Sequence, residues 1–261
     1  MSNCSKCLGK GTIIVVDPDT GHQLADVCSC KVQLVQDDLW SMRLRSSKIP
    51  KNYWGHSFNS YIKLPLLSGN VILSDATAVA ANRRSTASYN SKSFEYLKDF
   101  FTNPESYDKS PNVLWIWGNE PNTGHTSLAC CVGMELLKQG KRVHFSSMEE
   151  IRMKIMDFDN PENMQKLRNG IKKVDVFILD DALDVNRVFI SQKSTFDTNH
   201  LYSFVKILFE EDKKIICTSN RDLFQIKDTF SGIAQLLMRS CKVLEVKGSL
   251  NAYLKQLSDK R

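Results

Sequence analysis

The segment Val113–Ser127, with the sequence VLWIWGNEPNTGHTS, constrains the fold of this chain more than any other. A short apolar run ends at Gly118, and a polar loop rich in turn residues leads into Gly124–Thr126. Apolar side chains then recur every fourth position, the spacing of one buried helix face, at Leu128, Val132 and Leu136. A strand, a loop of this length and a helix N-terminus predict a phosphate-binding loop.

The loop departs from the pattern G-x-x-G-x-G-K-T at three positions. Asn119 and Asn122 replace glycines, and His125 replaces the lysine. Asparagine tolerates the left-handed backbone that such loops use. Histidine is shorter than lysine and mostly neutral at pH 7, so we expect weakened ATP binding with slow or absent hydrolysis. The alternative is an ordinary strand-to-helix turn. The residues expected to hold the nucleotide are Asn119, Asn122, Thr123, Gly124, His125, Thr126 and Ser127.

The rest of the C-terminal part alternates strands and helices. The run Asp175–Asp181 is apolar and ends in two carboxylates, as a fully buried parallel strand does. A strand at Lys214–Cys217 is followed by Thr218-Ser219-Asn220. Strands are also expected at 142–145 and 242–246, and helices at 147–158, 161–173, 200–211 and 231–240, with a polar insert at 186–198. This alternation predicts a doubly wound α/β domain with a parallel sheet, whose ligands lie beyond the carboxyl ends of the strands.

Five side chains in this domain are candidates for ATP chemistry. Thr126 stands where the hydroxyl of a phosphate loop meets Mg²⁺, and Asp180 would hold the same ion through water. Asp181 would orient or deprotonate the attacking water, and Asn220 would position that water or contact the γ-phosphate. Arg239 would reach a phosphate in a neighbouring subunit as an arginine finger. The alternatives are a solvated turn after a buried strand and a surface arginine at a helix end.

The eight cysteines divide into two kinds. Four lie within apolar segments and are expected in the core: Cys130, Cys131, Cys217 and Cys241. The other four flank a predicted hairpin and have the spacing of Zn²⁺ ligands: Cys4, Cys7, Cys28 and Cys30. So short a segment cannot bury a core of its own, and a structural metal would supply the missing folding energy. The alternatives are a disulfide pair, which is disfavoured in the cytosol, or four unrelated thiols.

Composition bounds the class of protein. The chain has 261 residues, 42% hydrophobic and 25% charged, with a formal net charge of +6. These values are typical of a globular protein, and the charge permits a nucleic-acid partner without demonstrating one. The apolar runs are too short to cross a bilayer, and the N-terminus lacks the pattern of a secretory signal, so we expect a cytoplasmic protein without a membrane partner.

Between the cysteines and the core we expect a helix over Lys31–Trp40, a linker over 41–65 and a helix over 93–102 that leads into the core strand. The linker mixes basic and aromatic residues. Its aromatic side chains either dock on the larger domain or mark a nucleic-acid or partner surface; they are Tyr53, Trp54 and Phe58.

The order of these parts resembles the AAA+ replicative-helicase loaders of the DnaC/DnaI type, especially their phage and prophage versions. The resemblance covers nearly the whole chain. It rests on the C-x-x-C-x-G-x-G hairpin that closes on C-x-C, the linker phrase Lys48–Trp54 and the altered phosphate loop. It continues through Phe177–Asp181, Thr218–Asn220 and the late helix with Arg239.

The resemblance implies a zinc module over 1–40 that contacts the replicative DNA helicase, a linker over 41–65 and an AAA+ domain over 66–261. The AAA+ domain would bind ATP, Mg²⁺ and single-stranded DNA, form a homo-oligomer on the helicase and help to place the helicase on DNA in a bacterial or phage-infected cell. By match, Asp181 would be the hydrolysis base, Asn220 sensor 1 and Arg239 the arginine finger, with Thr126 and Asp180 at Mg²⁺. His125 departs from the family's lysine. The alternatives are a non-hydrolysing pseudo-ATPase adaptor of the replisome and an IstB-like transposition ATPase, which generally lacks the zinc hairpin.

Overall fold

The computed structural model describes residues 4–16, 18, 21–69, 74–120, 122–155, 161–183, 194–227 and 231–250. The chain divides into two compact units, Met1–Ser46 and Ser47–Arg261, and each is described by itself. Among the described helices, none is both long enough and apolar enough to span a membrane.

Unit 1 contains a β-hairpin and a helix. Strands β1 (Thr12–Val16) and β2 (Gln23–Val27) pair antiparallel, with Thr12 opposite Val27. Helix α1 (Ser29–Ser47) is longer than the expected 31–40 and continues through part of the expected linker. Residues 41–47 include methionine, leucine and arginine, which favour helix, so nothing in their side chains stops it. The helix ends where Lys48 takes a left-handed φ of 57°, two residues before Pro50.

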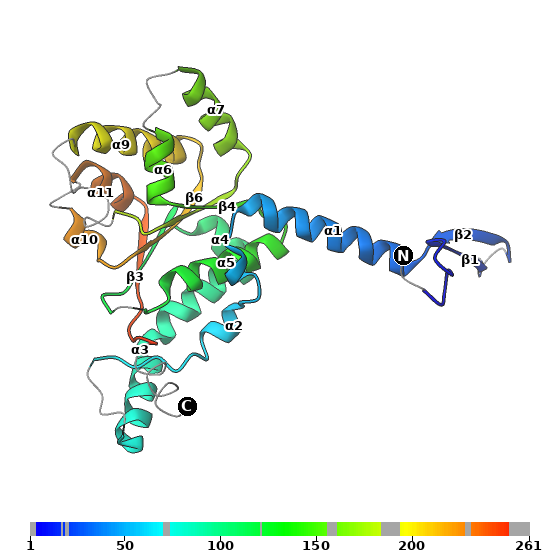
Figure 1. The fold of residues 1–261 in the computed structure, drawn as a ribbon, viewed down its shortest axis with the longest axis horizontal. Coiled ribbons are helices and arrows are strands. Elements are labelled where there is room, and N and C mark those ends of the chain that lie inside the picture. The colour runs from blue at the N-terminus through cyan, green and yellow to red at the C-terminus, as the bar shows by residue number, and fades with distance from the viewer. Residues whose placement is uncertain are drawn as a thin grey trace. The chain divides into compact units, whose positions relative to one another are not determined.

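Unit 2 is built on a five-stranded parallel sheet (Figure 1). The strands lie in the order β4-β5-β6-β3-β7, and each neighbouring pair is parallel. They are β3 (Val113–Trp117), β4 (Val143–Ser147), β5 (Val176–Asp180), β6 (Lys214–Ser219) and β7 (Cys241–Glu245). The predicted α/β domain with a parallel sheet is confirmed.

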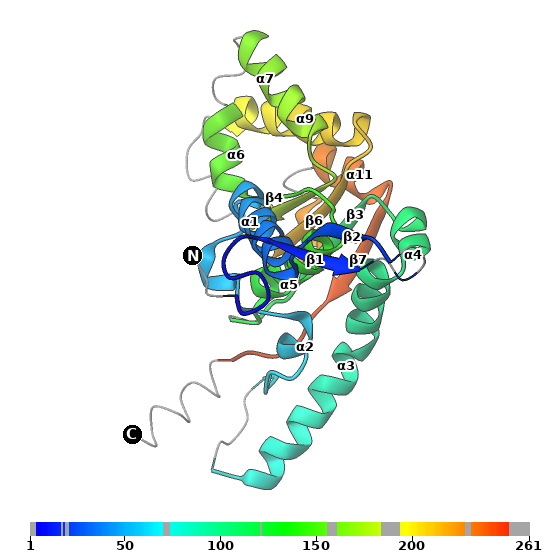
Figure 2. The ribbon, with the colours of Figure 1, turned by 90° about the vertical axis from the view of Figure 1, so that its right-hand side faces the viewer.

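Helices cover both faces of this sheet. Helices α3 and α5 lie on one face, and α6, α9 and α11 lie on the other (Figures 1 and 2). The described helices of unit 2 are α2 (Phe58–Tyr61), α3 (Ala76–Thr102), α4 (Pro104–Lys109), α5 (His125–Lys138), α6 (Met148–Ile155), α7 (Pro161–Lys172), α9 (Ser194–Glu210), α10 (Leu223–Ile226) and α11 (Ser231–Met238), with a 3-10 turn η1 (Lys51–Tyr53).

The core forms where strand side chains of alternating direction meet these helices. Trp115 and Phe177 face the helices of one layer and pack with Phe204 of α9. On the opposite face α5 approaches the sheet so closely that a Cβ on Gly133 would lie 2.7 Å from Cδ1 of Ile178. The expected core cysteines Cys130, Cys131 and Cys217 are buried, and Cys241 is half-buried.

Several element boundaries differ from the sequence prediction. The helix expected over 93–102 is the end of the single long helix α3, which starts after the N-cap Asp75. Helix α9 begins at Ser194, inside the expected polar insert. The threonine, asparagine and aspartate residues at its start have low helix propensity and therefore predict a loop from the sequence alone. Ser147 precedes α6 and its hydroxyl accepts from the Glu150 amide at 3.1 Å, while the Glu150 carboxylate accepts from the Ser146 hydroxyl at 2.8 Å. Residues 156–158 of the expected helix and 186–193 of the insert lie outside the described residues.

Candidate functional site

The carboxyl ends of three adjacent strands bring the predicted site residues together. The phosphate loop follows β3, Asp180 is the last residue of β5, and Asn220 follows β6. Strands β5, β6 and β3 are neighbours in the sheet, and parallel strands end at the same edge. Residues that are far apart in the sequence therefore meet at this edge of the sheet. His125 and Asn220, for example, are 95 positions apart.

Asp180 is held by hydroxyl groups from both sides. The Thr126 hydroxyl and the Thr218 hydroxyl each donate to its Oδ1 at 2.6 Å. The Thr218 oxygen also accepts from the backbone amide of Asp181 at 3.1 Å, and Asp181 has a left-handed φ of 51°. A hydroxyl and a carboxylate in contact offer the oxygen ligands that Mg²⁺ prefers, so the donor set fits that ion.

His125 is turned toward the strand edge and toward its own helix. Its Nδ1 accepts from the Thr126 amide at 2.9 Å, so the ring hydrogen lies on Nε2, which donates to Oδ1 of Asn220 at 3.1 Å. A lysine at this position carries no acceptor and would leave that first-turn amide to a ligand. The substitution therefore links two predicted site residues and also uses one of the N–H groups that a phosphate would bind.

The two loop asparagines were expected to permit a left-handed backbone. The loop has that backbone at one of these two positions. Asn122 has φ of 58° and Gly124 has φ of 80°, whereas Asn119 has no left-handed φ. Gly118 is required for a different reason, because a Cβ there would lie 2.6 Å from the Val246 carbonyl oxygen. Thr123 is buried and its hydroxyl donates to the Glu120 carbonyl at 2.5 Å.

Arg239 stands apart from the other candidates. It follows the last residue of α11, Met238, and its side chain is exposed. Its amide donates to the Leu236 carbonyl at 3.3 Å, and among the described residues no hydrogen bond or ion pair joins its guanidinium to the site. Its role as an arginine finger stays a prediction.

The sequence left open what the aromatic residues of the expected linker do, and missed their contacts with the loop. The buried Tyr61 hydroxyl donates to the Thr123 carbonyl at 2.7 Å, and His56 Nδ1 lies 3.0 Å from the Ser127 hydroxyl. Burial raises the pKa of Tyr53, with a further contribution from the negative charge of Asp180. Of the aromatic residues that the sequence singled out, the buried Phe58 packs edge to face against Phe101 of α3, with ring centroids 4.9 Å apart, so this ring docks on the rest of unit 2, one of the two expectations.

The four N-terminal cysteines of unit 1 form one compact cluster. Their sulfur atoms all lie within 4.8 Å of one another. Cys4 Sγ is 3.8 Å from Cys28 Sγ, and Cys7 Sγ is 3.4 Å from Cys30 Sγ. Tetrahedral zinc with Zn–S bonds of about 2.3 Å sets its sulfur ligands about 3.8 Å apart. All eight cysteines of the chain are described, and each is a free thiol, which leaves no disulfide pair here.

Local polarity shows why this cluster fits a cation. Backbone amides, first that of Cys7, lower the pKa of the Cys4 thiol to about 6. Hydrogen bonds with the Cys7 and Cys28 thiols raise the pKa of Cys30 to about 12. Four thiolates so close together repel one another unless a metal ion neutralises them. The donor set therefore matches a structural Zn²⁺ site.

Comparison with known proteins relates unit 2 to the bacterial DnaA ATPase domain. The family of the bacterial DnaA ATPase domain matches residues 99–235, more than half of the chain. The chromosomal replication initiator protein DnaA of Aquifex aeolicus (strain VF5) is 30% identical over 110 residues. That alignment covers 42% of this chain and 26% of the relative, so the chain spans about a quarter of the length of that protein.

Solved structures give the same fold. A replication initiator DnaA bound to AMPPCP and single-stranded DNA superposes with a TM-score of 0.50 and 22% identity, over 66% of this chain and 50% of that one. A DnaC helicase loader superposes with a TM-score of 0.51 and 16% identity, over 76% of this chain and all of that one, 100%. At these identities the likeness establishes the AAA+ fold.

Proposed function

The chain belongs to the family of the bacterial DnaA ATPase domain, and from this premise we propose that it is a helicase loader with an altered ATP site. In this proposal unit 2 binds Mg·ATP and single-stranded DNA, and unit 1 holds one Zn²⁺ and contacts the replicative helicase. The AAA+ units assemble on the helicase, where Arg239 completes a neighbour's site. The observation that carries the proposal is the meeting of Thr126, Asp180 and Asn220 at the edge where a nucleotide binds in this fold.

Each part of the nucleotide site has a role that its contacts support. The loop amides and the N-terminus of α5 would bind the phosphates. Thr126 and Asp180 would hold Mg²⁺, which would neutralise phosphate charge. Asp181 would orient water and Asn220 would bind the γ-phosphate or that water. His125 gives up its bond to Asn220 when a γ-phosphate arrives, so nucleotide binding competes with a contact already present.

Two features support the helicase and DNA parts of the proposal. Superposition with a DnaC helicase loader spans 76% of this chain, and the family match is to an ATPase of replication initiation. Unit 1 also exposes many large apolar side chains, which mark protein-binding surfaces. They are Leu8, Ile14, Val16, Leu24, Val27, Val32, Leu34, Val35, Leu39 and Met42.

A direct test combines capture and activity. Full-length tagged protein is incubated with the replicative helicases of candidate hosts, and helicase transfer onto single-stranded DNA circles is measured with and without Mg·ATP. The proposal predicts co-purification and faster loading. Absence of both would refute a loader. Helicase binding without nucleotide binding would support the pseudo-ATPase adaptor, and filaments on duplex DNA without helicase affinity would support the IstB-like transposition ATPase.

The histidine has its own test. His125→Lys restores a charge that reaches the phosphates and frees the Thr126 amide, so we expect about tenfold tighter Mg·ATP binding and a measurable rise in ATP turnover. Isothermal titration calorimetry and phosphate release on the same preparation check both. Turnover that stays at background while affinity rises would assign the remaining defect to other residues than His125.

A further inference from the structure

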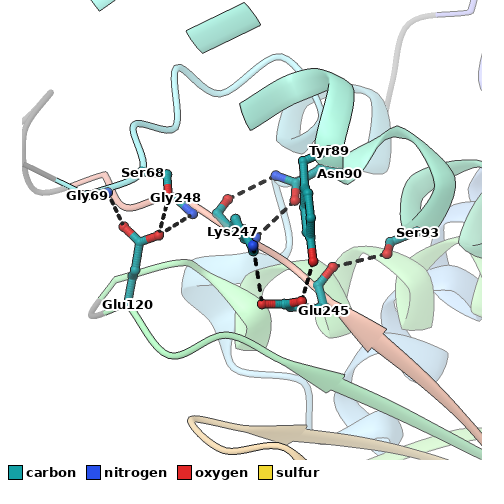
Figure 3. A network of polar contacts seen from close by, with 9 residues as sticks. All are labelled: Ser68, Gly69, Tyr89, Asn90, Ser93, Glu120, Glu245, Lys247 and Gly248. Carbon is teal, nitrogen blue, oxygen red and sulfur yellow. Dashed lines mark hydrogen bonds and ion pairs between the residues drawn. The ribbon is translucent and has the colours of Figure 1, made fainter. Parts of the chain in front are cut away.

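We infer that Glu120 is a positioning residue: its carboxylate anchors the phosphate loop from behind and makes nucleotide affinity depend on contacts of α3 with the segment after β7. The inference rests on the proposed nucleotide binding and names how that site keeps its shape. Glu120 occupies a position of the loop where a carboxylate facing inward would repel phosphate. The structure directs its carboxylate toward Ser68 and Gly69, in the segment before α3, and toward Gly248, after β7 (Figure 3).

Three donors hold the Glu120 carboxylate. The Ser68 hydroxyl donates to Oε1 at 2.6 Å and the Gly248 amide to the same oxygen at 3.1 Å. The Gly69 amide donates to Oε2 at 3.2 Å. These donors come from positions 52 and 128 residues away, before α3 and after β7. Hydrogen bonds to an ionised acceptor are about twice as strong as neutral ones, so the carboxylate is a strong anchor.

The loop carbonyls are also held from outside. The Leu250 amide donates to the Asn122 carbonyl at 3.2 Å, and the Tyr61 hydroxyl donates to the Thr123 carbonyl at 2.7 Å. In a planar trans peptide the N–H points opposite to the C=O. Fixing these two carbonyls therefore aims the amides of Thr123 and Gly124 to the opposite side, as phosphate binding requires. Hydrogen bonds from outside the loop therefore fix the backbone conformation that a glycine-rich sequence permits in other phosphate loops.

The segment after β7 is itself fixed to α3. Asn90, which is 1% exposed, bonds both backbone groups of Lys247, donating to its carbonyl at 2.9 Å and accepting from its amide at 2.9 Å. The Ser93 hydroxyl donates to the Glu245 carbonyl at 3.0 Å, and the Tyr89 hydroxyl donates to the Glu245 carboxylate. Figure 3 shows that the contacts of α3 and the contact of Glu120 meet on residues 245–248, at the C-terminal end of β7.

Lys247 completes the attachment. Its ammonium lies 3.9 Å from the centre of the Tyr89 ring and 3.9 Å from Glu245 Oε1. The position of the Lys247 ammonium over an aromatic ring and beside a carboxylate stabilises residues 245–248 at the end of β7. The chain of contacts therefore runs from α3 through residues 245–248 to Glu120 and the loop. A change on α3 that never touches nucleotide is expected to weaken its binding.

The test compares Glu120→Gln with Glu105→Gln, an exposed glutamate paired with Lys109 on α4. In Glu120→Gln the side-chain NH2 group faces the Gly69 N–H, so the hydrogen bond donated by Gly69 is lost and two donors face each other. We expect Mg·ATP affinity, measured by calorimetry on the full chain, to fall about tenfold in Glu120→Gln and to stay unchanged in Glu105→Gln. Ser68→Ala is a milder second variant if Glu120→Gln fails to fold.

A remote variant separates positioning from general stability. Asn90→Ala is expected to weaken Mg·ATP binding about fivefold, and in the double variant with Glu120→Gln the two effects are less than additive because they act on one network. Ser91→Ala is the matched control, since that hydroxyl bonds within α3 to the Ser88 carbonyl at 2.8 Å. Additive effects, or equal losses in Ser91→Ala, would overturn the inference.

Hydrogen exchange without nucleotide distinguishes this inference from the proposed function. The amides of Thr123 and Gly124 should exchange about tenfold faster in Glu120→Gln than in the wild type, with α9 unchanged. If wild type binds no Mg·ATP, the proposed ATP site fails but faster exchange still supports the anchor. If wild type binds Mg·ATP and the variant shows wild-type affinity and exchange, the anchor fails alone.

Discussion

The two units of this protein differ in how much apolar side-chain surface they bury. In unit 1 the buried side chains include the cysteines Cys7 and Cys28, while ten large apolar side chains of its described residues are exposed. In unit 2 both faces of a five-stranded sheet are covered, and Phe204 and Trp115 are fully buried. A hairpin with one helix cannot remove enough apolar surface from water, so we expect its folding to depend on a metal ion bound at the cysteine cluster. On the proposed zinc binding, this chain combines a unit whose folding depends on metal ligation with a unit whose folding depends on packing of its core.

The largest expected effect tests the ligation side of this comparison. Cys28→Ser should lower bound zinc from about one ion per chain to none and remove the protection of the β1 and β2 amides, because structural zinc contributes about 10–16 kcal/mol of apparent binding energy. Elemental analysis and hydrogen exchange measure both. Cys241→Ser, a half-buried cysteine of unit 2, is the control. Unchanged zinc in Cys28→Ser would exclude this site.

The packing side is tested by Phe204→Ala. Removing this fully buried ring should cost about 3–5 kcal/mol of unfolding free energy, through lost burial and a residual cavity. Phe224→Ala, at a ring that is 65% exposed, should cost less than about 0.5 kcal/mol. Denaturant unfolding followed by tryptophan fluorescence measures the difference. The zinc content should stay constant in Phe204→Ala. Loss of zinc in this variant would contradict the expectation that metal ligation in unit 1 and core packing in unit 2 stabilise the two units independently.

A smaller effect is expected where packing meets the nucleotide site. Thr218→Val keeps the shape of a fully buried side chain but removes the donor to Asp180 and the acceptor for the Asp181 amide. Leaving these groups unpaired should lower the free energy of unfolding by about 1–3 kcal/mol. Thr102→Val, at an exposed hydroxyl that bonds its own helix, provides the comparison. Equal unfolding free energies for the two variants would contradict the assigned hydrogen bonds.

The smallest predicted effect is a pH dependence of unit 2. Burial, with the nearby charges of Lys48 and Lys154, lowers the pKa of His144 to about 4. The unfolded imidazole titrates near 6.5, so between these values the unfolded chain binds more protons. Stability should fall by about 1–2 kcal/mol as pH drops from 6.5 to 4, after discounting for solvent contact of the ring. Glu150 opposes the shift without reversing it.

The measurement compares wild type with His144→Phe, which keeps a ring beside Phe177, where the centroids are 5.0 Å apart. The variant should lose this part of the pH dependence in urea unfolding at pH 7.5 and pH 4.5. His22→Gln, at an exposed hairpin histidine, should behave as wild type. A wild-type slope in His144→Phe would assign the pH dependence to other groups.

Sequence patterns predicted the parts of the molecule that depend on local order. The apolar run 175–181 and the loop after Trp117 were found because strand burial and turn chemistry are visible within ten residues. Their meeting at Asp180 followed from a general property of parallel sheets. The end of α1 was wrong because helix propensity continues past Trp40 until Lys48. The division into zinc module, linker and AAA+ domain, and the chemical roles of the site residues, remain predictions.

The anchoring of the phosphate loop lay beyond sequence reasoning. No local pattern singles out Glu120, because its partners Ser68 and Gly248 are far away along the chain. The bond between His125 and Asn220 was also missed, since a side chain shorter than lysine gives no sign of which neighbour it will meet. Long-range polar pairing is set by tertiary structure, and no local periodicity encodes it.

The strand order has a consequence for how the protein is made. Strand β3, which carries the phosphate loop, pairs with β6 and β7, so Val113 lies beside Ile215 and Cys241. More than 100 residues must therefore leave the ribosome after β3 before its neighbours exist, and the anchor at Leu250 emerges later still. Until then β3 is an apolar segment with two open edges, which is a hazard for aggregation. The proposed nucleotide site is therefore completed only after β7 and Leu250 have left the ribosome, and a nascent chain could bind ATP there only once the sheet has formed around β3.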